Sequence, residues 1–162
     1  MSGLQYTRKN IITGSLIFAA GDTVGAFIVN EFSFTRLLGI LLIGATVYAF
    51  EIPNYFVWIT RRTRIHEGIS AALYRTGLAL LYFNPLWITR HIFFIKFFSG
   101  DWSEINNNLF YIGWMSFLVN VPVSLLANYI IQNRITSHKR FLASTIFSGL
   151  ITVYYAVSVY WF

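Results

Sequence analysis

Five long stretches of mainly apolar residues dominate this chain. They cover residues 11–30, 37–60, 76–98, 108–132 and 141–162. A helix rises about 1.5 Å per residue, so about 20 residues cross the hydrocarbon core of a bilayer. The pattern therefore predicts an all-α fold, a polytopic membrane helix bundle with about five transmembrane helices. No segment between the stretches is long enough for a second unit, so residues 1–162 are expected to form a single transmembrane helical domain.

The composition argues against a soluble fold. Of the 162 residues, 56% are apolar and only 11% are charged, whereas a soluble domain carries about a quarter charged residues. The net charge of +6 does not indicate nucleic acid, because the basic residues sit between apolar stretches. The chain has no cysteine, and its three histidines lack metal-ligand spacing, so we expect no metal and no cofactor.

The basic residues predict the orientation in the membrane. If the N-terminus is cytoplasmic, nine of the twelve Lys and Arg residues fall on the inner side, and only Arg36, Arg90 and Lys96 fall toward the other. Cytoplasmic loops are enriched in Lys and Arg. We therefore predict a cytoplasmic N-terminus and, with five spans, an external C-terminus. Arg90 and Lys96 lie within the third stretch, where they must snorkel or line a wet cavity.

Two polar residues, Asp22 and Thr23, stand near the middle of the first stretch. A carboxylate at this depth is costly and faces either a partner or water. One interpretation is a group that couples transport to protons or binds a substrate amine. The other is a structural contact between helices, which the small neighbouring Gly21 also favours. The sequence leaves both open.

All three prolines lie inside predicted spans, each within two residues of a polar residue. Broken helices of this kind build midplane sites in transporters, although prolines also kink membrane helices without any function. We predict Pro-broken spans two, three and four and a substrate or proton pathway there. The pathway residues of these spans are Glu51, Pro53, Asn84, Pro85, Arg90, Asn120 and Asn128, with Pro122 as the third proline.

A polar turn separates the third and fourth stretches. Asp101 and Trp102 are expected to form an interfacial structural turn, with the indole ring at the lipid headgroups. Asp101 or Ser103 is expected to cap the helix that follows. No GxSxG, HExxH or Walker motif occurs in the chain, so we do not expect an enzyme.

Several short motifs recur in the order seen in a known family. Over about residues 15–134 the chain resembles the bacterial L-alanine exporter (AlaE) family. The resemblance rests on Ala20-Gly21-Asp22-Thr23, Arg36-Leu37, Pro53-Asn54-Tyr55, Phe83-Asn84-Pro85 and Gly100-Asp101-Trp102-Ser103-Glu104-Ile105. It implies an inner-membrane exporter driven by the proton gradient, in which Asp22 is the membrane-embedded carboxylate. The chain departs from the family pattern in its fifth span, in a third-span motif one residue shorter, and in the charges of that span.

A more distant likeness covers nearly the whole chain. It is similar to the eukaryotic peroxisomal and inner-mitochondrial small membrane-protein family, whose members are candidate pores. The matching elements are Gly14-Ser15-Leu16, Gly21-Asp22, Pro122, Leu126-Ala127-Asn128-Tyr129 and Arg140. This likeness accounts for the final span.

The functional expectation is export of L-alanine or a similar small amino acid by proton antiport. A zwitterion needs an anion for its ammonium group, for which Asp22 and Glu51 are candidates. It also needs donors for its carboxylate, and Arg75, Arg90 and helix N-termini are candidates. Five spans are few for a transporter, so we expect a homo-oligomer, most simply a dimer. The alternatives are a passive small-solute channel and a non-transporting subunit of a membrane complex.

Overall fold

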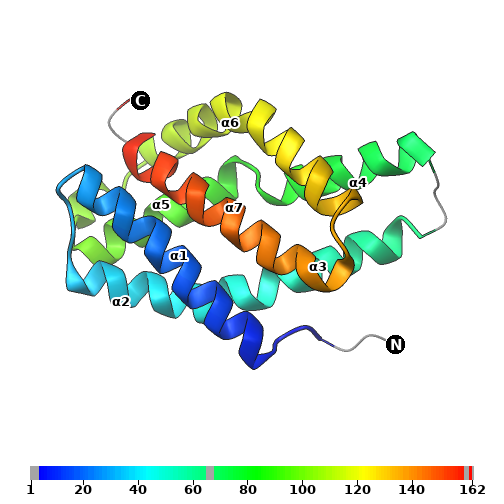
Figure 1. Ribbon diagram of the computed structural model, residues 1–162. Coiled ribbons are helices and arrows are strands. Elements are labelled where there is room, and N and C mark those ends of the chain that lie inside the picture. Colours follow the sequence, from blue (N-terminus) through cyan, green and yellow to red (C-terminus); the bar gives the residue numbers. More distant parts are fainter. Residues whose placement is uncertain (1–3, 65–67, 159–160, 162) are drawn as a thin grey trace.

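The computed structural model describes residues 4–64, 68–158 and 161, and all regular secondary structure in these ranges is helical (Figure 1). The elements in chain order are α1 (Arg8–Ile28), α2 (Phe34–Ile43), the π-helical η1 (Gly44–Tyr48), α3 (Ala49–Arg62), α4 (Gly68–Tyr82), α5 (Pro85–Ser99), the 3₁₀ turn η2 (Trp102–Glu104), α6 (Asn108–Asn133) and α7 (Ser137–Ser158).

Four helical segments of the described residues are long and apolar enough to cross a membrane. They are Arg8–Ile28, Phe34–Arg62, Gly68–Ser99 and Asn108–Asn133. The chain is a multi-pass membrane protein, and the predicted all-α helix bundle is confirmed. The fifth predicted stretch corresponds to α7, although its residues 159, 160 and 162 lie outside the described part of the chain.

The exterior is more apolar than that of a water-soluble protein, and the apolar core also holds buried polar and charged side chains. Large apolar side chains such as Leu126 and Leu150 are 64% and 68% exposed, while the interior holds Asp22, Arg36 and Gln132. In water this exterior would be an unusually large apolar patch. Burial of the polar side chains in the interior costs free energy unless they are paired. A bilayer solvates the exterior, so the polar groups gather inside.

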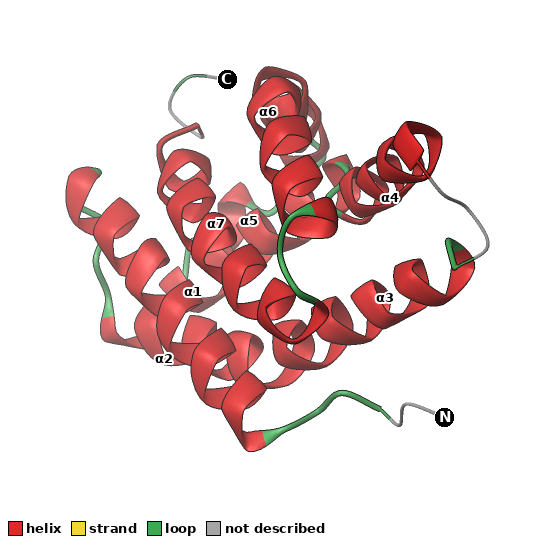
Figure 2. Ribbon diagram, turned by 45° about the vertical axis from the view of Figure 1, so that its right-hand side comes forward, coloured by secondary structure: helices red, strands yellow, loops and turns green. Residues whose placement is uncertain are grey.

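Helices α1 and α7 run side by side in the same direction (Figure 1). Glycines permit their close approach, because a Cβ atom on Gly21 would lie 2.2 Å from the carbonyl oxygen of Gly149. Small residues at such crossings are typical of membrane helices. Figure 2 shows α7 and α5 between the pair α1 and α2 on one side and the pair α4 and α6 on the other.

Side-chain caps fix several helix starts. Thr7 accepts a hydrogen bond from the backbone N–H of Asn10 before α1, and Ser33 accepts one from Arg36 before α2. Such caps satisfy N–H groups that have no partner inside the helix. They lie just ahead of the apolar stretches, so α1 and α2 each begin three residues before the predicted span.

The predicted proline breaks are only partly correct. Span three is interrupted, because α4 ends at Tyr82 and α5 begins at Pro85 after the N-cap Asn84. Pro53 and Pro122, by contrast, lie inside continuous helices, α3 and α6. A proline at the first helical position has no N–H to satisfy, so Pro85 starts a helix, whereas the other two remove one hydrogen bond each without ending theirs. The irregularity in span two is η1, before Pro53.

Candidate functional site

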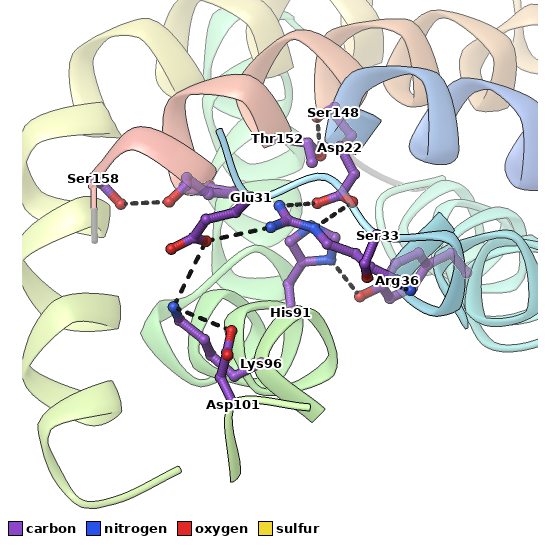
Figure 3. A network of polar contacts seen from close by, with 12 residues as sticks. Asp22, Glu31, Ser33, Arg36, His91, Lys96, Asp101, Ser148, Thr152 and Ser158 are labelled. Carbon is purple, nitrogen blue, oxygen red and sulfur yellow. Dashed lines mark hydrogen bonds and ion pairs between the residues drawn. The ribbon is translucent and has the colours of Figure 1, made fainter. Parts of the chain in front are cut away.

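Asp22 forms an ion pair with Arg36 inside the bundle (Figure 3). Arg36 Nε and Nη2 donate to the two carboxylate oxygens, each at 2.8 Å. Both residues are only 1% exposed. Asp22 comes from α1 and Arg36 from the first turn of α2, so the turn between the two helices brings them together. This bidentate geometry occupies both oxygens of Asp22.

The pair continues into a larger charge network at the end of the bundle where α1 and α5 end. Glu31 Oε2 lies 3.6 Å from Arg36 Nη1 and 3.8 Å from Lys96 Nζ. Lys96 also contacts Glu104 at 2.7 Å and Asp101 at 3.8 Å, and its side chain is only 3% exposed. The network ties the α1–α2 turn to the segment after α5 (Figure 3). Lys96 is therefore neutralised by carboxylates at the end of α5.

A second ion pair joins span two to span three. Arg90 Nη1 and Nη2 donate to Glu51 at 3.0 and 2.6 Å, and the Tyr82 hydroxyl donates to the same carboxylate at 2.9 Å. The Glu51 and Arg90 side chains are 33% and 35% exposed. They therefore form an accessible pair, in contrast to Asp22 and Arg36.

This accessible pair lines an open pocket of about 450 Å³, which we call the Glu51 pocket. Its wall also contains Asn84 and Trp87. Asn84 accepts the backbone N–H of Trp87 at 3.0 Å, so the start of α5 faces the pocket. The positive end of the α5 dipole and the guanidinium of Arg90 thus lie beside the carboxylate of Glu51. A pocket of this size falls in the usual range for small-molecule sites.

An aromatic cluster packs behind the pocket. The Tyr48 hydroxyl shares a hydrogen bond of 2.8 Å with His91 Nδ1, and Arg90 lies over the Tyr48 ring. The rings of Trp87 and His91 stack at 5.6 Å. His91 and Tyr48 are fully buried. This cluster packs against Arg90 and Trp87 and holds them in place.

Helices α6 and α7 face each other with small polar side chains. Asn120 donates to the Ser124 hydroxyl at 2.9 Å and to the Tyr155 hydroxyl at 3.4 Å. Asn128 donates to the Ser124 carbonyl, while its own Oδ1 has no hydrogen-bond partner among the described residues. A cavity of about 10 Å³ adjoins these groups, which is room for one water molecule.

The predicted pathway residues fall into separate places rather than one site. Glu51, Asn84 and Arg90 line the Glu51 pocket, and Trp87 forms its boundary with the cavity that Asn120 and Asn128 line. Asp22 and Glu51, the two candidates for the substrate ammonium group, are paired with different arginines.

Four other residues that were predicted to contribute to the site do not line the Glu51 pocket or the cavity between α6 and α7. Pro53 lines a different pocket at the opposite face of α3, and Thr23 is half-buried without a side-chain hydrogen bond in the described chain. Pro85 serves as the first residue of α5. Arg75, a candidate for the substrate carboxylate, donates to Asn133 at 2.9 Å instead, because α4 packs against α6.

A turn follows α5 where the sequence places one, and its details differ from the expectation. Gly100 adopts a left-handed conformation with φ of 86° and ends α5. The Trp102 ring stacks on Phe97 at 5.7 Å and is 66% exposed. The prediction that Asp101 or Ser103 caps the next helix was wrong, because Asn106 accepts the backbone N–H of Asn108 at 2.8 Å. Asp101 instead contributes to the charge network.

Sequence reasoning missed several residues of these sites, among them Arg36, Tyr48, Tyr82 and His91. Arg36 was interpreted as an orientation signal, although a basic residue in an apolar stretch, three positions after a cap, can also indicate a buried counter-ion. Nothing in the local sequence distinguishes Tyr48 and Tyr82 from the eight other tyrosines.

The comparisons with known proteins identify no relative. No family model, no curated protein and no solved structure matches the chain. Among the described residues, no group of three or more His, Cys, Asp or Glu side chains is placed to hold a metal ion. The functional argument therefore rests on the site itself.

Proposed function

We propose that this chain exports L-alanine or a similar small amino acid by exchange for protons across the inner membrane of a bacterium. The observation that carries the proposal is the Glu51–Arg90 ion pair, which is partly exposed in a pocket of about 450 Å³ within the membrane spans. Ionisable residues at such depth are costly and usually line a polar pathway. The motif resemblance to the L-alanine exporter family supports alanine as the substrate.

The chemistry of the Glu51 pocket matches a zwitterion. Glu51 and the Tyr82 hydroxyl supply oxygen acceptors for an ammonium group. Arg90 offers a planar pair of donors for a carboxylate, and the positive end of α5 reinforces it. A bound amino acid separates the two charged side chains and replaces each partner with one of its own charges, so both remain neutralised.

The carboxylate of Glu51 also explains how amino-acid export is coupled to proton movement. A proton on Glu51 removes the negative charge that attracts the ammonium group, so proton and substrate compete for one site. Competition of this kind is the basis of exchange. Each time the site changes the side of the membrane to which it opens, it carries either a proton or the amino acid. Asp22 then serves to hold α1 against α2, since Arg36 occupies both of its oxygens.

The orientation and assembly follow from charge. Basic residues at the end of α3 and the start of α7 meet around one pocket, whereas Glu31, Asp101 and Glu104 gather at the other end. The basic end is placed in the cytoplasm by the preference of cytoplasmic loops for Lys and Arg. The Glu51 pocket contains a partly exposed charged pair that lipid cannot solvate, so we include a second copy of the chain, as a homodimer, beside it.

The test is transport by purified protein in liposomes and by cells fed an alanine dipeptide. Glu51→Gln is expected to lower proton-driven alanine efflux by about thirtyfold or more, since truncating a paired charge costs 2 kcal/mol or more. Arg90→Lys keeps the charge but loses the fork geometry and is expected to weaken alanine binding. The matched control is Glu104→Gln, which changes a 55% exposed carboxylate at the far end.

Each outcome decides between the candidate functions. Proton flux that accompanies alanine in the wild type and disappears in Glu51→Gln supports exchange. Alanine flux without protons identifies a passive channel. Full activity of Glu51→Gln, with protein levels equal to the wild type, refutes the role of the pocket, and absence of any flux in the wild type favours a non-transporting subunit.

A further inference from the structure

A second pocket lies at the basic end of the bundle, away from the Glu51 pocket. It has a volume of about 280 Å³ and lies between the segment before α1, the end of α3 and the start of α7. We call it the basic-end pocket. Its polar rim includes Asn10, Thr60, Arg61, His138 and Arg140. None of these residues lines the Glu51 pocket, so the two sites are independent.

One cation of the rim, Arg140, has neutral hydrogen-bond acceptors and no carboxylate partner among the described residues. Among the described residues that line the pocket, none is acidic. Arg140 Nε donates to the Ile135 carbonyl at 3.0 Å and Nη1 donates to the Thr60 hydroxyl at 3.1 Å. These neutral acceptors hold the guanidinium in a fixed orientation, and no ion pair joins it to a carboxylate within residues 4–64 and 68–158. The α7 helix begins at Ser137, and its N-terminal N–H groups favour an anion at the same place.

The inner wall of the pocket is apolar. Phe56 and Phe141 are 4% and 7% exposed, and Val57 lies beside them. The pocket therefore combines a cationic rim with an apolar wall at the end of a membrane span, because α3 ends at Arg62. A freely dissolved anion would use the rim alone. An anionic phospholipid uses both, with its phosphate at the rim and its glycerol and acyl carbons along the wall.

We propose that the basic-end pocket binds the phosphate of an anionic phospholipid, with Arg140 as its principal cation. The bound lipid links the ends of α1, α3 and α7, which otherwise carry like charges. Thr60 acts here as a positioning residue, because it holds Arg140 and lies on the pocket rim.

The experiment measures lipid binding to the purified, delipidated full chain by native mass spectrometry. Phosphatidylglycerol is the anionic probe, and phosphatidylcholine of the same acyl length is the zwitterionic one. The wild type is expected to retain phosphatidylglycerol in preference to phosphatidylcholine. Arg140→Gln is expected to weaken phosphatidylglycerol binding by about fivefold, the loss expected for one basic residue at a membrane surface. Arg62→Gln is the matched control, since Arg62 is exposed and lies outside the pocket.

Additional arms keep the test decisive. Arg61→Gln changes a second rim residue and is expected to weaken phosphatidylglycerol binding if Arg140→Gln does not fold. Inorganic phosphate at millimolar concentration distinguishes a free anion from a lipid, because a true lipid site loses little phosphatidylglycerol to it. Equal binding of the two lipids, unchanged binding by both rim variants, or full displacement by inorganic phosphate would overturn the proposal.

Discussion

The Asp22–Arg36 pair permits a quantitative test of what holds α1 against α2. Asp22→Asn leaves a guanidinium that is 1% exposed and cannot lose its proton. Loss of one partner of a buried pair costs about 3–5 kcal/mol. Glu31, 3.6 Å from Arg36 Nη1, retains part of the compensation. We therefore expect a loss of about 3 kcal/mol, at the lower end of that range.

Substitution of the other partner, Arg36, is expected to lower the free energy of unfolding by less. Arg36→Met leaves a carboxylate, which can neutralise itself by taking up a proton, whereas arginine has no such option. In the double variant no buried charge remains unpaired. Replacement of a whole buried pair is often close to neutral, so the double variant is expected to be more stable than Asp22→Asn alone.

The assay is reversible unfolding in mixed micelles with increasing SDS, followed by far-ultraviolet circular dichroism. The wild type, both single variants and the double variant form a cycle whose coupling energy is expected to be about 2–3 kcal/mol. Arg62→Gln, at an exposed arginine outside the charge network, serves as the control. Additive effects of the two single substitutions, or an Asp22→Asn variant as stable as the wild type, would refute the reasoning.

Two further predictions use the same assay. Gly21→Ala is expected to cost about 1–3 kcal/mol, because the new Cβ would meet the Gly149 carbonyl at 2.2 Å, while Gly77→Ala, with no atom within 4 Å, is expected to be neutral; equal effects would contradict the close helix contact. Lys96→Met is expected to destabilise the turn after α5, because it leaves carboxylates clustered without their shared cation. Faster amide exchange at Gly100 is the measurement, and an exchange rate equal to the wild type would argue against the network.

The elements that depend on local sequence were predictable. Apolar length located the membrane segments to within a few residues, except in span three, where Arg75 shortened the apparent stretch and the helix begins at Gly68. Asn84 before Pro85 is a local start signal, and the interruption there was anticipated. The sequence does not distinguish Pro122, where the helix continues, from Pro85, where it is interrupted. Whether a helix continues through a proline depends on what packs around the freed carbonyl.

The pairing of charges depended on tertiary packing. Glu51 and Arg90 are 39 residues apart and meet only because α3 and α5 border one pocket. Asp22 and Arg36 are 14 residues apart and require the turn that folds α2 back on α1. Composition indicates that buried charges must have partners, but it does not assign them. The sequence therefore identified Glu51 and Arg90 as candidates without indicating that they form one site.

The two carboxylates at membrane depth now have different expected roles, and one variant separates them. The double variant with Asp22→Asn and Arg36→Met is expected to recover stability, so its transport can be measured without a folding defect. If Glu51 carries the proton, this variant exports alanine at a rate close to that of the wild type. If Asp22 is the coupling group, the stable double variant loses proton-driven export although Glu51 and Arg90 are intact. That result would transfer the proton pathway to the Asp22 end of the bundle.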